Sequence, residues 1–198
     1  MRIYLCRHAQ EAEDGGITRL GERQSLALAR FLAGEGAESL YSSDLKRAVE
    51  TAKVVGDGLG LGVKIVPEFR EISTNSPEDW TEYVKTHHME LDFPVGGKES
   101  LNEVMKRGRK ALDKVIRQEK GKRVAIIAHG VFTKALLYSL GYRDQLIKNS
   151  HVANTGVTIL EGERGNILLV KFNHYGHLFP LRLREIVDGL FRKIFKKR

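Results

Sequence analysis

The sequence contains very little cysteine. Cys6 is the only one among 198 residues, so no disulfide can form within the chain. No apolar run approaches the roughly 20 residues that a membrane-spanning helix needs. The first strand-like stretch is followed at once by Arg7 and His8, which is not the pattern of a signal peptide. These absences predict a globular protein of a reducing, cytoplasmic environment.

Motifs of several other enzyme classes are also missing. The adjacent pair Ser42 and Ser43 lies outside any G-x-S-x-G turn, so a serine hydrolase is not indicated. Two histidine pairs have no Asp, Glu or Cys partner at a spacing typical of zinc sites: His87 with His88, and His174 with His177. We therefore expect no metal site at these histidines.

Positive charge is concentrated at one end of the chain. The net charge is +8, and residues 182–198 hold seven basic and two acidic residues, which gives this segment +5. The remainder carries little net charge, so we expect no nucleic-acid partner. Large apolar residues recur there at helical spacing: Leu183, Ile186, Val187, Leu190, Phe191, Ile194 and Phe195. We expect residues 179–198 to form a basic amphipathic helix, covered by its own domain, by a second subunit in a homodimer, or by a peripheral contact with a membrane surface.

Strand-like and helix-like segments alternate along the chain. Apolar and β-branched runs predict strands over residues 2–6, 39–42, 63–66 and 123–128, and a hairpin formed by 155–161 and 166–172. Capping residues and amphipathic spacing predict helices over 18–34, 44–59, 100–119 and 131–140, and a helix that begins at Ser76. Ser43 or Asp44 is expected to cap the second helix, and residues 91–98 are expected to form a loop. The alternation predicts an α/β three-layer sandwich with a mainly parallel sheet flanked by helices.

Chemically useful residues follow two of the predicted strands. Arg7 and His8 come after the first strand, and His129 and Gly130 come after the strand over 123–128. In open α/β sheets, ligands bind beyond the carboxyl ends of the strands. We therefore expect these residues, far apart in sequence, to meet at one edge of the sheet.

Four sequence elements occur in order: Leu5-Cys6-Arg7-His8-Ala9, residues 42–52 with Arg47, Phe69-Arg70-Glu71-Ile72, and Ile127-Ala128-His129-Gly130. Together they closely resemble the histidine phosphatase superfamily, which has the phosphoglycerate-mutase-like fold. Residues 18–24, 97–100 and 173–178 resemble further parts of the family pattern, so the likeness covers about residues 1–178. It implies a phosphatase domain over 1–178 with a small cap at about 74–100.

The resemblance also implies roles for individual residues. His8 would be a nucleophile that is transiently phosphorylated, and Glu71 would be the general acid and base. Arg7, Arg47 and His129 would hold the phosphoryl group, with His129 cationic when phosphate is bound, and the amides near Gly130 would add to anion binding. The chemistry is consistent, because two arginines can clamp a phosphate bidentately and an acid can protonate the leaving oxygen. Protein groups supply everything needed, so we expect no metal and no cofactor.

Several functions remain open at this point. The leading one is hydrolysis of a phosphorylated small molecule. A phosphoglycerate mutase uses the same catalytic set. The family often has glycine after the nucleophile, whereas this chain has Ala9, which also occurs in the branch that resembles small protein phosphohistidine phosphatases. Dephosphorylation of phosphohistidine on a protein is therefore a further alternative. From another class, the chain would be a non-catalytic module that binds anionic surfaces through its tail.

Overall fold

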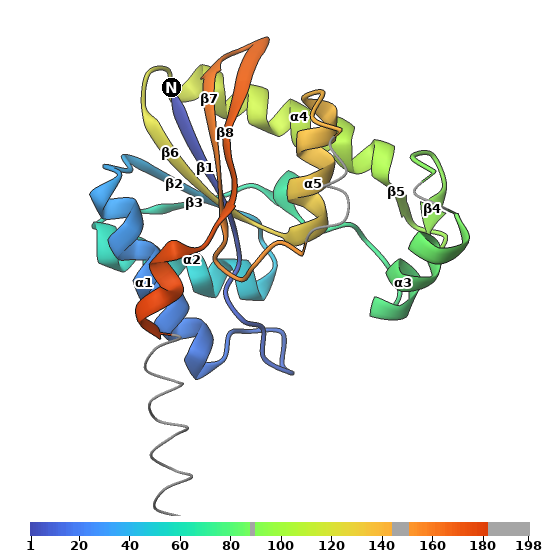
Figure 1. Cartoon of the computed structure of the whole chain (residues 1–198), viewed down its shortest axis with the longest axis horizontal. Coiled ribbons are helices and arrows are strands. Elements are labelled where there is room, and N and C mark those ends of the chain that lie inside the picture. The colour runs from blue at the N-terminus through green and yellow to red at the C-terminus, as the bar shows by residue number, and fades with distance from the viewer. Residues whose placement is uncertain (88–89, 144–150, 182–198) are drawn as a thin grey trace, which may run out of the picture.

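The computed structural model describes residues 1–87, 90–143 and 151–181 (Figure 1). Six strands form one sheet in the order β3-β2-β6-β1-β7-β8. Their bounds are β1 Arg2–Arg7, β2 Ser39–Ser42, β3 Val63–Ile65, β6 Arg123–Ala128, β7 Val157–Glu163 and β8 Asn166–His174. The strands β3, β2, β6 and β1 run parallel, whereas β7 is antiparallel to β1 and β8 is antiparallel to β7.

The register of the two central strands fixes the position of the site. β1 pairs with β6 in parallel, with Arg7 opposite Ala128. The residues that follow these two strands, His8 after β1 and His129 after β6, are therefore neighbours. The His8 N–H donates to the Ala128 carbonyl over 2.8 Å. The expected meeting of the two strand ends is found in the structure.

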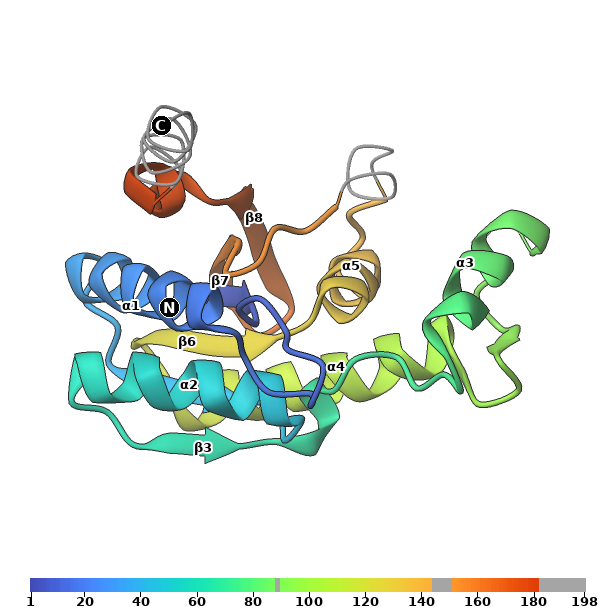
Figure 2. The same cartoon turned by 90° about the horizontal axis from the view of Figure 1, so that it is seen from below.

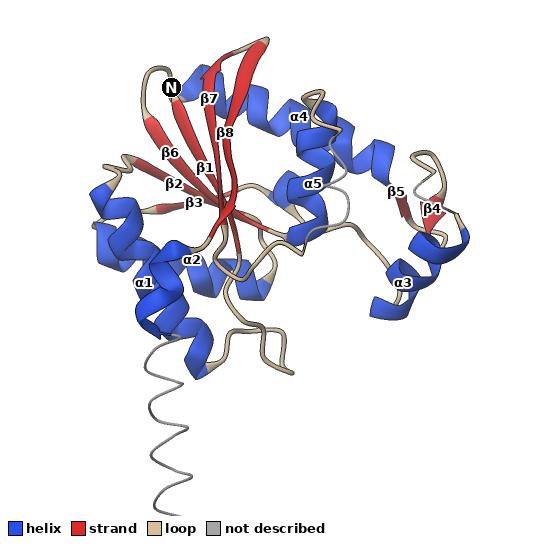
Figure 3. Ribbon diagram, viewed as in Figure 1, coloured by secondary structure: helices blue, strands red, loops and turns tan. Residues whose placement is uncertain are grey.

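Helices cover both faces of the sheet, as Figure 3 shows. α1 Arg19–Gly34 and α2 Lys46–Leu59 pack on one face, and α4 Leu101–Gln118 and α5 Gly130–Ser139 on the other. Alternate residues of β1 enter the two cores: Tyr4 and Cys6 on the α1–α2 side, Ile3 and Leu5 on the α4–α5 side. The predicted three-layer α/β class is thereby confirmed.

The segment 74–100 extends from the edge of this sandwich (Figure 2). It contains α3 Pro77–Thr86 and the short antiparallel pair of β4 Pro94–Val95 and β5 Glu99–Ser100. α3 begins as predicted, with a capping box between Ser76 and Asp79 and a proline in its first turn. The loop expected over 91–98 is interrupted by β4, which pairs with β5 ahead of α4.

The start of α2 differs from the prediction. α2 begins at Lys46 after Leu45, and no side chain caps it. Neither expected cap is free for this role, because the Ser43 hydroxyl contacts His129 and the Asp44 carboxylate pairs with Arg70. Tertiary contacts thus override the local capping preference of these residues.

The chain ends in a segment that is described only in part. The 3₁₀ helices η1 Pro67–Phe69 and η2 Gly176–Leu178 complete the elements, and residues 179–181 begin a helical turn. The predicted basic helix covers residues 179–198, and its part from 182 onwards lies outside the described residues. Within the described part of the chain, every helix is too short or too polar to span a bilayer.

Candidate active site

His8 lies at the centre of the candidate site, directly after β1. It is almost fully buried, and its Nδ1 lies 2.7 Å from the Ala9 carbonyl. A carbonyl oxygen only accepts, so Nδ1 carries the proton and Nε2 keeps a lone pair. Nε2 faces the Arg47 guanidinium, whose Nε donates to it over 3.2 Å. The geometry therefore fixes one tautomer and aims the other nitrogen at a cation.

The charge state of His8 follows from its surroundings. Burial, then the positive charges of Arg47 and Arg7, lower the pKa of His8 to about 3. The imidazole is therefore neutral across the physiological range. A neutral imidazole keeps a lone pair with which it can attack an electrophile, whereas an imidazolium does not.

The two arginines approach His8 from different elements. Arg47, in the first turn of α2, also pairs with Glu11 over 3.1 Å. Arg7, the last residue of β1, donates through Nη1 to the Val152 carbonyl over 2.5 Å and to His151 Nε2 over 2.9 Å. The Arg7 Nε is buried and has no hydrogen-bond partner among the described residues. A Cβ at Gly130 would lie 3.6 Å from this nitrogen, so Gly130 sits directly beneath the guanidinium.

His129 is fully buried next to His8, with ring centroids 5.1 Å apart. Its Nε2 lies 2.7 Å from the Ser43 hydroxyl, while its Nδ1 is buried without a partner in the described part of the chain. Burial lowers the pKa of His129 well below its usual value, and the neighbouring His8, Arg47 and Arg7 lower it further. His129 is therefore neutral in this structure.

Glu71 occupies the N-terminus of α5. Its carboxylate accepts hydrogen bonds from the Val131 N–H over 3.0 Å and from the Phe132 N–H over 2.7 Å. Free N–H groups and the helix dipole favour an anion at this position. Two of the amides near Gly130, a region that the family resemblance implies would bind an anion, thus donate to the protein's own carboxylate. The negative charge of Glu71 also opposes the lowering of the Arg7 pKa that burial causes.

Arg107 on α4 holds the loop that carries Glu71, a role that the sequence did not indicate. Its five N–H donors are all used. Two bonds reach the Glu99 carboxylate over 2.6 and 3.0 Å, and three reach the carbonyls of Glu68, Arg70 and Glu71 over 2.6, 2.9 and 3.1 Å. Glu99 also accepts from the Ser73 N–H over 3.1 Å, where the 74–100 segment begins. One ion pair therefore fixes the Glu71 loop and the start of that segment together.

Residues just before β7 also support the site and were missed by sequence reasoning. The His8 carbonyl accepts from the Thr155 N–H over 3.2 Å and from Asn154 Nδ2 over 3.3 Å. Thr155 adopts a positive φ of 52° to make this contact. Neither these residues nor His151 stands in a recognisable motif, so only the fold reveals their place.

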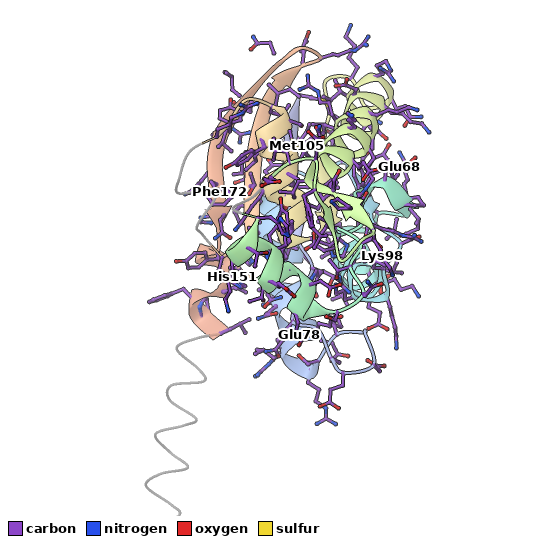
Figure 4. All side chains as sticks on the ribbon, turned by 90° about the vertical axis from the view of Figure 1, so that its right-hand side faces the viewer. Glu68, Glu78, Lys98, Met105, His151 and Phe172 are labelled. Carbon is purple, nitrogen blue, oxygen red and sulfur yellow. The ribbon has the colours of Figure 1, made fainter. Side chains whose placement is uncertain are left out.

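A cleft of about 980 Å³ opens above these groups. Its lining includes Arg7, Arg47 and Glu71, side chains from 67–76, and Trp80 of α3. Figure 4 looks at the molecule from the α3 side, with Glu68 and Lys98 labelled on one side of α3 and His151 on the other. The cleft, which the 74–100 segment borders, therefore reaches Arg47, whose guanidinium contacts His8.

The other histidines and the cysteine have structural surroundings. His174 and His177 pack on Phe31 of α1, and burial lowers the pKa of His177 to about 4. His87 stacks on Phe93, whereas His88 lies outside the described residues. Burial raises the pKa of the Cys6 thiol, which makes it unreactive. Among the residues that the structure describes, no group of three or more His, Cys, Asp or Glu is arranged around a metal position.

Comparisons with known proteins point in one direction. A probable phosphoglycerate mutase of Yersinia enterocolitica is 28% identical over 162 residues, which cover 71% of this chain and 74% of the relative. Among solved structures, a phosphoserine phosphatase of Entamoeba histolytica with 3-phosphoglyceric acid has a TM-score of 0.77 at 22% identity, covering 90% of this chain and 99% of the other. A mycobacterial glucosyl-3-phosphoglycerate phosphatase has a TM-score of 0.76 at 22% identity, covering 88% and 99%.

These structural likenesses concern the fold, and the expected phosphoglycerate-mutase-like architecture is confirmed by them. The model of the histidine phosphatase superfamily (branch 1) matches residues 3–174, which include all four sequence elements that carry the resemblance. The chain therefore belongs to the histidine phosphatase superfamily.

Proposed function

We propose that this protein is a metal-independent phosphomonoester hydrolase that works through a phosphohistidine intermediate on His8. The observation that carries the proposal is the state of this residue. Its Nδ1 is tied to Ala9, its Nε2 lone pair faces Arg47, and its pKa is lowered to about 3. A phosphate monoester carries nearly two negative charges at neutral pH, and Arg7 and Arg47 supply matching charge without a metal.

The reaction has two steps in this proposal. His8 Nε2 attacks phosphorus while the bond to the leaving oxygen breaks. In this proposal the negative charge of the bound substrate favours a protonated Glu71, which gives its proton to that oxygen. Water then attacks the phosphohistidine, Glu71 accepts the proton, and inorganic phosphate leaves with His8 restored. Charge stabilisation is the main contribution of the remaining residues.

Two unpartnered donors support a phosphoryl site beside His8. Buried polar groups without partners are rare, and Arg7 Nε and His129 Nδ1 are both of this kind in the described residues. We assign the Ser43 hydroxyl as the donor to His129 Nε2, so that Nδ1 of the neutral ring carries a proton that it can donate. A bound phosphoryl group would give both donors an acceptor, and its charge would favour the cationic form of His129. The 74–100 segment then serves as a small cap over a domain of residues 1–178.

A second candidate is a phosphoglycerate mutase, because the curated relatives carry that name. A mutase returns the phosphoryl group from histidine to another hydroxyl of the substrate, whereas a phosphatase transfers it to water. The two activities share the first step and differ in the product.

The test uses an activated aryl phosphate and 3-phosphoglycerate with wild type and His8→Ala. We expect phosphate release that persists after chelation of divalent ions and falls by several orders of magnitude in His8→Ala. Formation of 2-phosphoglycerate faster than phosphate release would favour the mutase. Turnover that survives His8→Ala, or that needs Mg²⁺ or Zn²⁺, would contradict the proposal.

A further inference from the structure

The cations of the cleft determine what the site can accept beyond a phosphoryl group. Four arginines line it among the described residues: Arg7, Arg47, Arg70 and Arg107. Arg7 and Arg47 lie beside His8, where the phosphoryl dianion is expected to engage both. Any carboxylate on the leaving group must therefore find its partner in Arg70 or Arg107.

Both of these arginines are already neutralised by carboxylates of the protein. Arg70 binds both oxygens of Asp44 through Nε and Nη2. Arg107 binds both oxygens of Glu99, and its remaining N–H groups go to backbone carbonyls, so it has no donor left. A bidentate arginine–carboxylate pair is matched in geometry as well as in charge. A substrate carboxylate would have to displace Asp44 or Glu99 to obtain a cation.

The rest of the lining is neutral or negative. Ile72 and Trp80 give the cleft apolar walls, and Ser73 and Thr74 offer hydroxyl groups. Glu68 lines the same cleft and adds a negative charge (Figure 4). A carboxylate placed here would lose water, meet a like charge and gain no free cation. An alcohol also loses water, but it meets no charge repulsion and can form hydrogen bonds with the hydroxyl groups of the lining.

We propose that the substrate is a phosphomonoester whose leaving group is an uncharged alcohol, because Asp44 and Glu99 withhold Arg70 and Arg107 from any substrate carboxylate. This inference rests on the proposed phosphatase function. It distinguishes this protein from the structural neighbours that were solved with phosphoserine and with 3-phosphoglyceric acid, both of which carry carboxylates.

The direct test compares glycerol 3-phosphate with 3-phosphoglycerate, which differ only in a hydroxymethyl group against a carboxylate. We expect kcat/KM for glycerol 3-phosphate to exceed that for 3-phosphoglycerate by at least about tenfold, as expected for a charge left without a partner. Equal values, or a preference for 3-phosphoglycerate, would overturn the inference.

Variants test whether Asp44 causes the preference. Asp44→Asn frees Arg70 and should raise the ratio of kcat/KM for 3-phosphoglycerate over glycerol 3-phosphate about tenfold. The double variant Arg70→Gln/Asp44→Asn should return to the wild-type ratio, since the gain requires the freed arginine. Asp113→Asn is the matched control, because Asp113 pairs with Arg109 on α4 outside this cleft and should leave the ratio unchanged. An unchanged ratio in a folded Asp44→Asn protein would overturn the role of Asp44.

Binding measurements separate this inference from the proposed function. Calorimetry on His8→Ala gives the Kd of both phosphates without turnover. Tighter binding of glycerol 3-phosphate supports the inference even if wild type hydrolyses neither compound, a result that would defeat the proposed function alone. Tighter binding of 3-phosphoglycerate overturns the inference even if wild type is an active phosphatase.

Discussion

His8 is exposed to two opposing influences on its protonation. Burial and two neighbouring arginines lower its pKa, whereas the hydrogen bond to the Ala9 carbonyl raises it, and the first set prevails at about 3. We expect NMR of the free protein to show His8 as the neutral Nδ1–H tautomer from pH 7 down to about pH 4. A midpoint near the ordinary value of 6.5, or the Nε2–H tautomer, would contradict this account.

At this scale the sequence predicts the residues in local motifs and misses the others. His8 and His129 could be predicted because each follows a strand in a recognisable pattern. Ser43, Arg107 and His151 could not, because the contacts that place them at the site are made with residues 86, 39 and 144 positions away. Ser43 was expected as a helix cap and instead contacts the ring of His129, a contact that only the packing of β2 beside β6 creates.

At the scale of elements, α4 positions the loop before the 74–100 segment through Arg107. We expect Arg107→Lys to lower kcat by about tenfold to a hundredfold, because lysine cannot make the five bonds that hold the Glu71 loop. The loss should be larger for an alkyl phosphate than for an activated aryl phosphate, since a displaced Glu71 matters most when the leaving oxygen needs a proton.

Two further variants make this kinetic test specific. Arg109 lies on the same helix and contacts Asp113 and the Ser139 carbonyl. Arg109→Lys should therefore leave kcat for both substrates unchanged. In a Glu71→Gln background, Arg107→Lys should cost little more, because both changes remove the same proton transfer. Equal losses on both substrates, or full additivity with Glu71→Gln, would show that Arg107 acts on general stability.

Element boundaries followed the sequence wherever a local signal was undisputed. α3 begins at its predicted cap and proline, and β6 has the predicted bounds, because these signals face no tertiary competitor. α2 and α5 are different. Their first turns border the site, where Asp44 and Glu71 are used for contacts between elements. The sequence therefore predicts which elements form. It does not predict the contacts at the start of α2 and α5, where residues of the site bind across elements.

At the scale of the whole molecule, Glu119 ties the sheet to α4 at the opposite edge from the site. Its buried carboxylate binds Ser39, Tyr41, Lys64 and Lys122, and these partners lower its pKa from 4.5 to about 2. A carboxyl group whose pKa is lowered by folding stabilises the fold at pH values above its pKa in the unfolded chain. This contribution is lost as the pH falls towards the folded-state pKa of about 2.

We therefore expect Glu119→Gln to lower the free energy of unfolding by about 1–3 kcal/mol at neutral pH. The difference from wild type should shrink between pH 4.5 and pH 2, as measured by urea unfolding at each pH. Glu82→Gln, on the exposed side of α3, is the matched control and should change little. A difference that is constant across this range, or absent at neutral pH, would contradict the assignment.

The basic tail remains a prediction for the whole chain. Seven large apolar residues in a helix cannot all remain in water without cost, so a partner surface should cover them. We expect a chain that ends at Leu178 to keep some turnover and to lose stability, self-association or binding to anionic vesicles, as read by urea unfolding, light scattering and vesicle flotation. A full-length protein that is monomeric and ignores such vesicles would leave only its own domain as the covering surface.

The most direct test of the central proposal is detection of the intermediate. The protein is mixed with an activated aryl phosphate, quenched within milliseconds under non-acidic conditions, and measured by intact-mass and peptide mass spectrometry. We expect one added phosphoryl group on His8, formed at a rate that equals or exceeds turnover and absent in His8→Ala. Turnover without a phosphoryl adduct on His8, or with the adduct on another residue, would contradict the account.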